Sequence, residues 1–540
     1  MTAAVIAPSC EAATPTPLRG LWKHGLIFLL LLAAVMATID FDSSVTSDDG
    51  AYGWQVHALE DGTWPLERTL PVVAGENEGI INGSVGPDGP WAYTRHPGYV
   101  LAQRALADVF GFVLGMHLLS LVALVSLPFV VAAVAARVDP EMTVPAFWLA
   151  AVSPVMVNGS GLWAHAPAAV LAGVSLGAAI RLVQRPGLGA SAVLAVSLVG
   201  GVLVRSEAVL WAGAITLAIV VVARDLPRLL YASSALVASA VAVVVERRIA
   251  ADLVADALPI PAASDVPTRP SFLAGRIPAA WHELFSGTLG GGGLAGSLAL
   301  IGLVLLVAGA VRCRRARFAD ARVLLVAGLA AYGARLLVLD GDLITGIVTA
   351  WPAVVVALIA VPVRLGPPLQ VAATSASIFT LAVLATQYSS GSGDGWGGRY
   401  LSNAVPALCL LTAAAVLAAP RDRFMRGVAV GLLVLPLASG LLGAHQRRTL
   451  HEDSIDYVLQ LQTDVVVTEV PALPRLAWAD AGAAEWYRST PDRLAPFLVE
   501  LAEADVDRIT VQGFPDRELG LAGYELVYVD AGLRQLVVQR

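Results

Sequence analysis

The chain has 540 residues, of which 57% are hydrophobic and 14% are charged, and its formal net charge at pH 7 is −7. Soluble globular domains are roughly half apolar and about a quarter charged, so this composition excludes an ordinary soluble protein. No basic run suggests a nucleic-acid footprint. The three cysteines, Cys10, Cys313 and Cys409, lie far apart and predict neither a disulfide framework nor a metal–thiolate site.

Long apolar runs predict that the chain crosses a membrane many times as helices. A span needs about 20 apolar residues, because the backbone must satisfy its own hydrogen bonds in lipid. The first run has no small-residue cleavage site, so we expect it to remain as a helix. We predict about thirteen spans, near residues 21–39, 113–136, 142–158, 165–183, 188–204, 207–223, 229–246, 294–311, 322–339, 343–363, 369–388, 400–419 and 426–443.

Basic residues in the short loops predict the orientation of these spans. Arg19 and Lys23 lie at the start of the first span, and the loop after every even-numbered span contains arginine. All these residues face one side if the N-terminus is cytoplasmic, which makes the chain a multi-pass protein of the plasma (inner) membrane. An odd number of spans then places the C-terminal tail outside. The loop arginines are Arg137, Arg181, Arg185, Arg224, Arg228, Arg312, Arg314, Arg315, Arg317, Arg364, Arg421, Arg423 and Arg426.

Composition divides the chain into two domains. Residues 1–443 form the predicted all-α transmembrane domain, including long outer loops at 40–97 and 247–293. Residues 444–540 are more charged and contain strand-like segments near 464–468, 509–512, 525–529 and 535–538. A helix is expected from Pro491, with Thr490 as its N-cap. The tail therefore predicts a small α/β domain on the outer surface.

Charged residues are scarce within the spans and gather at their predicted outer ends. Ionisable groups inside a membrane protein are costly and tend to mark function. Acids and arginines at one surface suit an anionic lipid head group, whereas an ion path would need such groups at mid-depth. Alternatively, span ends simply meet water, where polar residues belong. The gathered residues are Asp40, Asp42, Asp48, Asp49, His165, Arg205, Glu207, Arg335, Asp340, Asp342, Asp394 and Arg399.

The adjacent acids Asp48 and Asp49 open a predicted short helix just after the first span. The helix mixes Tyr52, Trp54 and other apolar residues with polar ones, a pattern that would let it lie along the membrane interface. A carboxylate at that depth could accept the proton of an attacking hydroxyl. The two acids could instead cap the helix N-terminus, where the helix dipole favours negative charge. The local chemistry leaves both readings open.

Four segments, in order along the chain, resemble motifs of membrane glycosyltransferases of the GT-C fold, such as protein O-mannosyltransferases and lipid A aminoarabinose transferases. All four are predicted to lie outside. They are Asp-Asp-Gly-Ala-Tyr at 48–52 with Gly-Thr-Trp at 62–64, Arg-His-Pro-Gly-Tyr at 95–99 leading to Phe-Gly at 110–111, Val-Arg-Ser-Glu-Ala at 204–208, and Gly-Trp-Gly-Gly-Arg-Tyr at 395–400 with Pro406. The chain departs from the family at Asp49, where glutamate is usual, and at Gly98, where a second proline is usual.

The resemblance implies an inverting transfer of a sugar from a polyprenyl-phosphate donor to an extracytoplasmic glycan, lipid or protein acceptor. Asp48 would be the catalytic base, and Asp49 would orient it, help to bind the acceptor, or hold a metal. Arg399 and Arg205 would bind the donor phosphate, because a guanidinium fork matches phosphate oxygens. Further implied substrate contacts are Tyr52, His57, Arg95, His96, His165, Glu207 and Tyr400.

Several alternatives stay open. A lone histidine at a helix end is often a structural hydrogen-bonder, which is the other reading of His57, His96 and His165. No metal site is predicted, although a divalent ion is possible. The sugar could be mannose, arabinofuranose or another pentose or hexose, so that a mannosyltransferase and an arabinosyltransferase are both compatible. The chain could instead be a lipid or glycan transporter, or a non-catalytic relative. Charges within the spans and repeated halves would favour a transporter, and the sequence shows neither.

Overall fold

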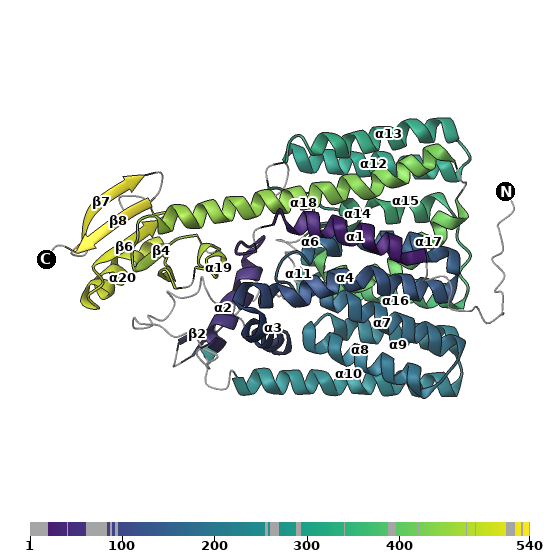
Figure 1. Ribbon diagram of the computed structural model, residues 1–540, viewed down its shortest axis with the longest axis horizontal. Helices are drawn as coiled ribbons and strands as arrows, with labels where there is room; N and C mark the ends of the chain where they lie inside the picture. Colours follow the sequence, from purple (N-terminus) through teal and green to yellow (C-terminus); the bar gives the residue numbers. More distant parts are fainter. Residues whose placement is uncertain are drawn as a thin grey trace. The chain divides into compact units, whose positions relative to one another are not determined.

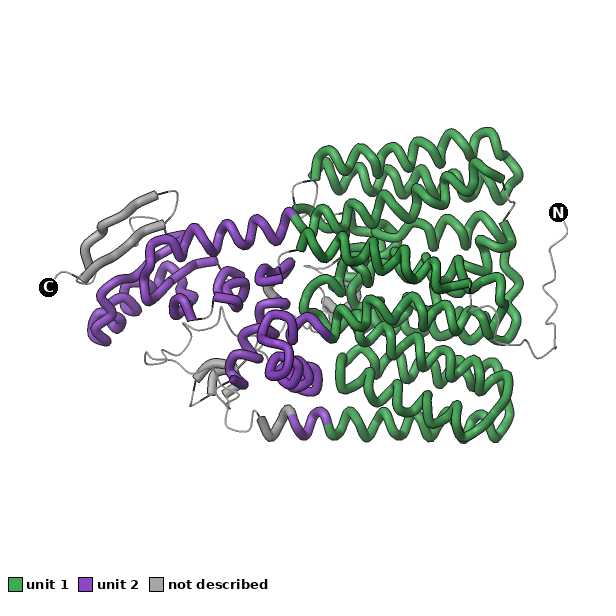
Figure 2. Tube along the Cα trace, viewed as in Figure 1, with its two compact units in different colours: residues 1–39, 119–245, 265–445 green, residues 40–118, 246–264, 446–540 purple. Residues whose placement is uncertain are grey.

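The computed structural model describes residues 20–39, 41–60, 84–86, 89–91, 96–253, 258–259, 269–287, 293–339, 341–386, 396–419, 422–470, 472–480, 482–514, 524–530 and 533–538. Most of the described residues are helical (Figure 1). The chain forms two compact units (Figure 2). Unit 1 comprises Met1–Ile39, Leu119–Val245 and Asp265–His445, and unit 2 comprises Asp40–Leu118, Glu246–Ser264 and Gln446–Arg540.

Seven helices among the described residues are long and apolar enough to cross a membrane. They are α4 (Phe112–Val138), α7 (His165–Gln184), α10 (Leu226–Leu253), α12 (Leu294–Arg314), α16 (Pro367–Thr386), the segment Arg399–Ala418 made of η3 (Arg399–Ala404) and α17 (Val405–Ala418), and α18 (Arg423–Leu459). Three shorter apolar helices accompany them, α1 (Leu21–Met36), α8 (Leu188–Val204) and α9 (Ala208–Ala223). These helices are consistent with a multi-pass membrane protein.

Two of the predicted spans are broken by proline. The segment 142–158 consists of η2 (Pro140–Met142), α5 (Thr143–Ala151) and α6 (Pro154–Asn158). The segment 343–363 consists of α14 (Ile347–Ala350) and α15 (Pro352–Ala360). Proline lacks a backbone N–H and moves the preceding residue out of the α region, and both Pro154 and Pro352 begin a new helix. These two predicted spans are therefore built from successive short helices and not from one continuous helix.

A further predicted span, 322–339, corresponds to α13 (Phe318–Arg335). This helix is apolar along most of its length but contains Asp320, Arg322 and Arg335. It packs against α12, which also packs against α15. In unit 1, α12 and α13 lie side by side with their axes nearly parallel (Figure 1). α13 is not among the seven long apolar helices, because it contains these three charged residues.

Unit 2 gathers segments that are far apart in the sequence. α2 (Ser47–Glu60) packs against α3 (Pro97–Phe110) and α19 (Leu473–Leu476). Strand β1 (Ser84–Gly86) pairs with β2 (Gly89–Trp91) and with β3 (Leu258–Pro259), both antiparallel. The two predicted outer loops are thus joined by a small sheet. The helix α11 (Arg269–Leu284), within the second of these loops, belongs to unit 1.

The C-terminal part of unit 2 is an α/β fold, as the sequence predicts. Its five-stranded sheet has the order β5-β4-β6-β8-β7, with β4 parallel to β5 and β6, and β8 antiparallel to β6 and β7. The strands are β4 (Val465–Thr468), β5 (Glu485–Arg488), β6 (Arg508–Gln512), β7 (Tyr524–Asp530) and β8 (Leu533–Val538). β5, only four residues long, is absent from the sequence-based prediction.

Helix α20 (Pro491–Glu503) begins at the predicted position, after Thr490. Its buried residues recur at the spacing of one helical face. They pack with side chains from β4, β5 and β6 in a core made of Val465, Val467, Tyr487, Leu494, Phe497, Leu498, Leu501, Val506, Ile509, Val511 and Phe514. The apolar face of α20 therefore covers the core of this fold.

Asp480, which lies after α19, should make the stability of unit 2 depend on pH. Partial desolvation, followed by repulsion from Asp456 and Asp42, raises the pKa of Asp480 above its ordinary value of 3.8. A raised pKa in the folded state means that this carboxyl group adds stability below about pH 3.8, and that the contribution is lost as pH rises through the folded value. Asp480→Asn should raise the melting temperature slightly at pH 7, and the gain should vanish towards pH 3.8.

Thermal unfolding between pH 4 and pH 7, about the range in which an acid with a raised pKa titrates, tests this expectation. Asp453→Asn replaces another exposed acid of unit 2 and serves as the control. An equal gain in both variants, or a gain that grows as pH falls, would contradict the role assigned to Asp480.

Candidate functional site

The residues that the sequence singles out fall into two groups, one in each unit. His165, Arg205, Glu207, Arg399 and Tyr400 belong to unit 1, and Asp48, Asp49, Tyr52, His57 and His96 belong to unit 2. Arg95 lies outside the described residues, as do Asp40, Asp340, Asp394, Gly395 and the Gly-Thr-Trp segment at 62–64.

In unit 1 the Trp-Gly-Gly-Arg-Tyr segment is fixed by its backbone. The side-chain amide of Asn158 donates to the carbonyl of Trp396 (2.8 Å), and the backbone N–H of Trp396 donates to Oδ1 of Asn158 (3.1 Å). Gly397 and Gly398 both have left-handed conformations, with φ of 60° and 61°. Glycine adopts this region without steric cost. The two glycines turn the chain so that Arg399 begins η3.

Gly398 has no room for a side chain. A Cβ atom there would lie 2.8 Å from the carbonyl oxygen of Glu283 and 2.9 Å from Cβ of Ile347. Gly398→Ala should therefore lower stability by about 1–3 kcal/mol, because an L residue in this conformation is strained and the neighbouring backbone must move. Thermal unfolding of the purified protein measures the loss.

The control for Gly398 is Gly427→Ala, at a helical position of α18 where a Cβ would meet nothing within 4 Å. Alanine favours a helix by up to about 1 kcal/mol over glycine, so this variant should be at least as stable as the wild type. Equal melting temperatures for the two variants would show that the Gly398 conformation does not constrain the segment.

The arginine cluster of unit 1, defined here as Trp163, His165, Arg205, Glu207, Arg399 and Tyr400, is built on aromatic rings. The guanidinium carbon of Arg399 lies 5.0 Å from the ring centres of both Trp163 and Tyr400. That of Arg205 lies 5.7 Å from the Tyr400 ring. Both arginines are more than nine-tenths buried. Two cations thus converge on one tyrosine, and cation–π attraction helps to hold them there.

Arg205 is also held by an ion pair within its own turn. Its Nε lies 2.9 Å from one carboxylate oxygen of Glu207, and its second terminal nitrogen donates to the other oxygen at 3.0 Å. The hydrogen bond from the terminal nitrogen is charge-assisted and therefore stronger than one between neutral groups. The Arg-Ser-Glu turn between α8 and α9 therefore positions Arg205, and Glu207 neutralises part of its charge.

Trp163 is a residue that the sequence reasoning did not assign to the site. It is 3% exposed, contacts the ring of His165 edge-on at 5.4 Å, and stacks with Arg399. Its indole Nε1–H is buried and has no hydrogen-bond partner within the described part of the chain. A buried polar group usually has a partner, so this donor is suited to a bound ligand. Its position two residues before His165 was the available signal.

In unit 2 the acid pair divides into two environments. Asp49 is 2% exposed, and its Oδ2 accepts hydrogen bonds from the backbone N–H groups of Val45 and Thr46, both at 3.2 Å. Asp49 is thus the third residue after Thr46 and reaches back to it, as the acid of a capping box does. Asp48 is half-buried in the first turn of α2. Of the two acids, Asp49 is therefore the one that caps the N-terminus of α2.

Helix α2 is buried within unit 2, so its apolar side chains contact protein, which the sequence did not predict. Tyr52 and Val56 are almost fully buried, and the Nε1–H of Trp54 donates to the carbonyl of Pro474 (2.8 Å). The ring of Trp478 lies where a Cβ of Gly53 would be. The aromatic residues of α2 therefore pack against protein from the C-terminal segment, which sequence alone could not place beside them.

The two histidines near the acid pair have structural surroundings. One ring nitrogen of His57 lies 2.9 Å from the carbonyl of Trp478 and the other lies 3.0 Å from Glu60, while the ring stacks on Phe112. These contacts favour the structural reading of His57. His96 is buried with φ of 55° and is the N-cap residue of α3. The first turn of α3 also contains Tyr99, whose ring meets Tyr52 edge-on at 5.4 Å.

The second of the four family-like segments, which ends in Phe-Gly at 110–111, contains a helix, as expected. α3 begins with Pro97 at its first position and ends at Phe110, followed by Gly111 with φ of 86°. Proline at the start and glycine after the end are the usual helix signals. No group of three or more potential metal ligands occurs among the residues that the structure describes, and the carboxylate of Asp49 is engaged by backbone N–H groups.

Comparison with known proteins places the fold. No protein-family model and no curated protein matches the sequence. Eleven chains of solved structures match the structure. One is ArnT from Cupriavidus metallidurans in the apo state, with 13% sequence identity and a TM-score of 0.51, over 96% of this chain and 98% of that one. ArnT is a GT-C aminoarabinose transferase. The chain thus has an ArnT-like GT-C fold over nearly its whole length.

Proposed function

We propose that this protein is a membrane glycosyltransferase that moves a sugar from a polyprenyl-phosphate donor to an acceptor outside the cytoplasm. The ArnT-like fold supports a transferase that uses a lipid-linked sugar. The transfer proceeds by direct displacement with inversion at the anomeric carbon.

The observation that most favours this function is the convergence of Arg205 and Arg399 on Tyr400. Two buried guanidinium groups that converge on one ring repel each other, and Glu207 pairs with Arg205. A phosphate between them would relieve the repulsion and match the planar donor geometry of arginine. Arg399, which stacks on two rings, is the principal phosphate ligand in this proposal, with Trp163 as a neutral donor.

In the proposed reaction the acceptor hydroxyl oxygen forms a bond to the anomeric carbon while the bond from that carbon to the phosphate oxygen breaks. The phosphate leaves with the bonding electron pair, and its added negative charge is stabilised by Arg399. Asp48 accepts the hydroxyl proton. Asp49 supports Asp48 by holding the turn before α2 through its bonds to Val45 and Thr46.

The predicted orientation agrees with a lipid-linked donor. If the N-terminus is cytoplasmic, the predicted spans next to Asp48, Arg205 and Arg399 have these residues at their outer ends. Nucleotide sugars are made inside the cell, so a donor for an outer site must be carried by a lipid. The C-terminal α/β fold lies on the same outer side in this orientation.

The test uses the full chain in lipid nanodiscs with a panel of polyprenyl-phosphate sugars, including aminoarabinose, mannose and arabinofuranose, and candidate acceptors. Release of polyprenyl phosphate together with a glycosylated acceptor is the expected result. Movement of intact donor across the bilayer without bond cleavage would instead establish a transporter. Donor binding without either outcome across the panel would establish a non-catalytic relative.

A further inference from the structure

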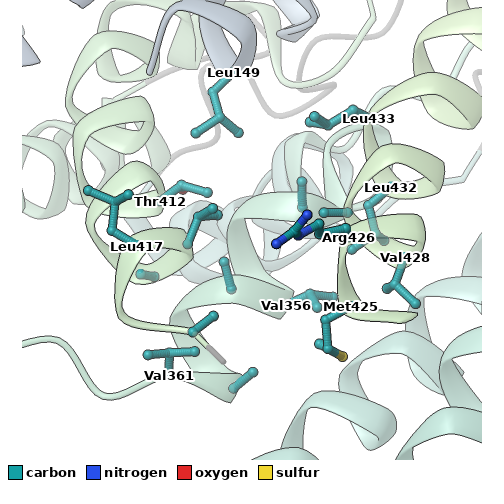
Figure 3. A pocket seen from close by; sticks show the side chains of 17 residues that line it. Leu149, Val356, Val361, Thr412, Leu417, Met425, Arg426, Val428, Leu432 and Leu433 are labelled. Carbon is teal, nitrogen blue, oxygen red and sulfur yellow. The ribbon is translucent and has the colours of Figure 1, made fainter. Parts of the chain in front are cut away.

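Unit 1 contains an apolar cavity of about 450 Å³ that does not involve the arginine cluster. It lies among α5, α15, α17 and the beginning of α18 (Figure 3). Its volume is within the range of about 300–1,000 Å³ that is usual for ligand pockets. The walls are aliphatic, formed by residues such as Leu149, Val356, Leu417 and Leu432.

Two polar groups interrupt this apolar lining. Arg426 extends its guanidinium group towards the middle of the cavity in Figure 3, and it is exposed. Thr412, from α17, is 1% exposed, and its hydroxyl has no hydrogen-bond partner in the described part of the chain. The cavity therefore offers one cation, one buried hydroxyl and an apolar wall.

The carboxylate nearest in sequence to Arg426 is paired with another arginine. Asp422, one helical turn before Arg426, forms an ion pair with Arg322 at an N–O distance of 3.0 Å. Among the residues that the structure describes, no carboxylate forms an ion pair with Arg426. An anion is therefore the complementary group, and water alone is a poor occupant because it needs several polar partners in a site that has few.

The position of the cavity indicates where the ligand comes from. Its lining includes the last residues of α15 and α17 and the first turns of α18, all close in sequence to Arg364, Arg421 and Arg423. The rule that basic loops are cytoplasmic puts these helix ends at the inner leaflet, where anionic phospholipids attract basic residues. The proposed sugar transfer takes place at the opposite ends of the spans.

We propose that this cavity binds one anionic phospholipid of the inner leaflet, with an acyl chain among the aliphatic residues and the phosphate paired with Arg426. The phosphate group accepts from the guanidinium fork of Arg426. Thr412 supplies a hydroxyl donor deeper in the cavity, suited to the ester oxygen of the lipid. This proposal is independent of the glycosyltransferase activity.

Native mass spectrometry of the full chain tests it, with phosphatidylglycerol and phosphatidylcholine of identical acyl chains as probes. We expect one phosphatidylglycerol to remain bound, with about tenfold weaker binding of phosphatidylcholine. Arg426→Gln should weaken phosphatidylglycerol binding by about the same factor. Arg423→Gln removes a neighbouring exposed arginine that does not line the cavity, and it should leave binding unchanged.

A second pair of variants tests the apolar part. Ala360→Phe fills the cavity from the end of α15 and should remove the bound lipid, whereas Ala418→Phe places the same ring at an exposed position outside the cavity and should not. Equal retention of both lipids, or equal losses in Arg426→Gln and Arg423→Gln, would overturn the proposal. Added polyprenyl phosphate must also fail to displace phosphatidylglycerol, since displacement would assign the cavity to a polyprenyl lipid.

Discussion

Asp48→Asn is expected to lower the turnover of sugar transfer by about 10²–10⁴-fold, the range that a general base contributes. Asparagine has nearly the shape of aspartate but cannot take up the acceptor proton. Asp48 is half-buried in the first turn of α2, so the substitution should preserve the helix. The release of polyprenyl phosphate at saturating donor measures the effect, and the donor KM should change little.

The adjacent acid provides the matched control. Asp49→Asn keeps an oxygen that can accept from Val45 and Thr46 but removes the charge from these bonds. It should lower the melting temperature, because a capping interaction is worth about 0.5–2 kcal/mol, and reduce turnover far less than Asp48→Asn. Full activity of Asp48→Asn would contradict its role as the base. Loss of turnover only in Asp49→Asn, without loss of stability, would assign the base to Asp49.

The local patterns of the sequence predicted the element types well. The apolar periodicity and Thr490-Pro491 start of α20, and four of the five strands in the C-terminal sheet, follow from the sequence alone. The length of the apolar runs predicted continuous helices near Pro154 and Pro352, where the structure has breaks. Hydropathy does not show where a missing backbone N–H ends a helix. β5 was missed because four residues, two of them charged, give too short an alternation to recognise.

Contacts between distant segments were beyond the reach of these patterns. The aromatic side chains of α2 suggested a membrane interface, but Trp54 and His57 contact the carbonyl groups of Pro474 and Trp478, more than 400 positions later. Trp163 was not assigned because its contact with Arg399, more than 200 positions later, is a tertiary contact. In contrast, the Arg-Ser-Glu and Gly-Gly-Arg-Tyr turns could be found from sequence, because their geometry depends on neighbouring residues.

Arg399→Gln is expected to lower kcat/KM for the lipid-phosphate donor by about 10²–10³-fold, the loss typical of removing one stabilising donor at developing charge. The donor phosphate gains negative charge as the sugar leaves, so a positively charged ligand binds the transition state more tightly than the ground state. Much of the loss should therefore appear in kcat. Steady-state kinetics with varied donor separates kcat from KM.

Conservative variants show whether the charge or the planar geometry of Arg399 is responsible for its effect on kcat/KM. Arg399→Lys keeps the charge but loses the planar fork and the stacking on Trp163 and Tyr400, so its kcat/KM should lie between those of wild type and Arg399→Gln. Tyr400→Phe keeps the ring and removes only the oxygen that accepts from Arg399 at 3.2 Å, and should cost about tenfold or less. Equal activity of Arg399→Gln and wild type would contradict the assignment of Arg399 as the phosphate ligand. A loss confined to KM would instead limit Arg399 to binding the donor in its ground state.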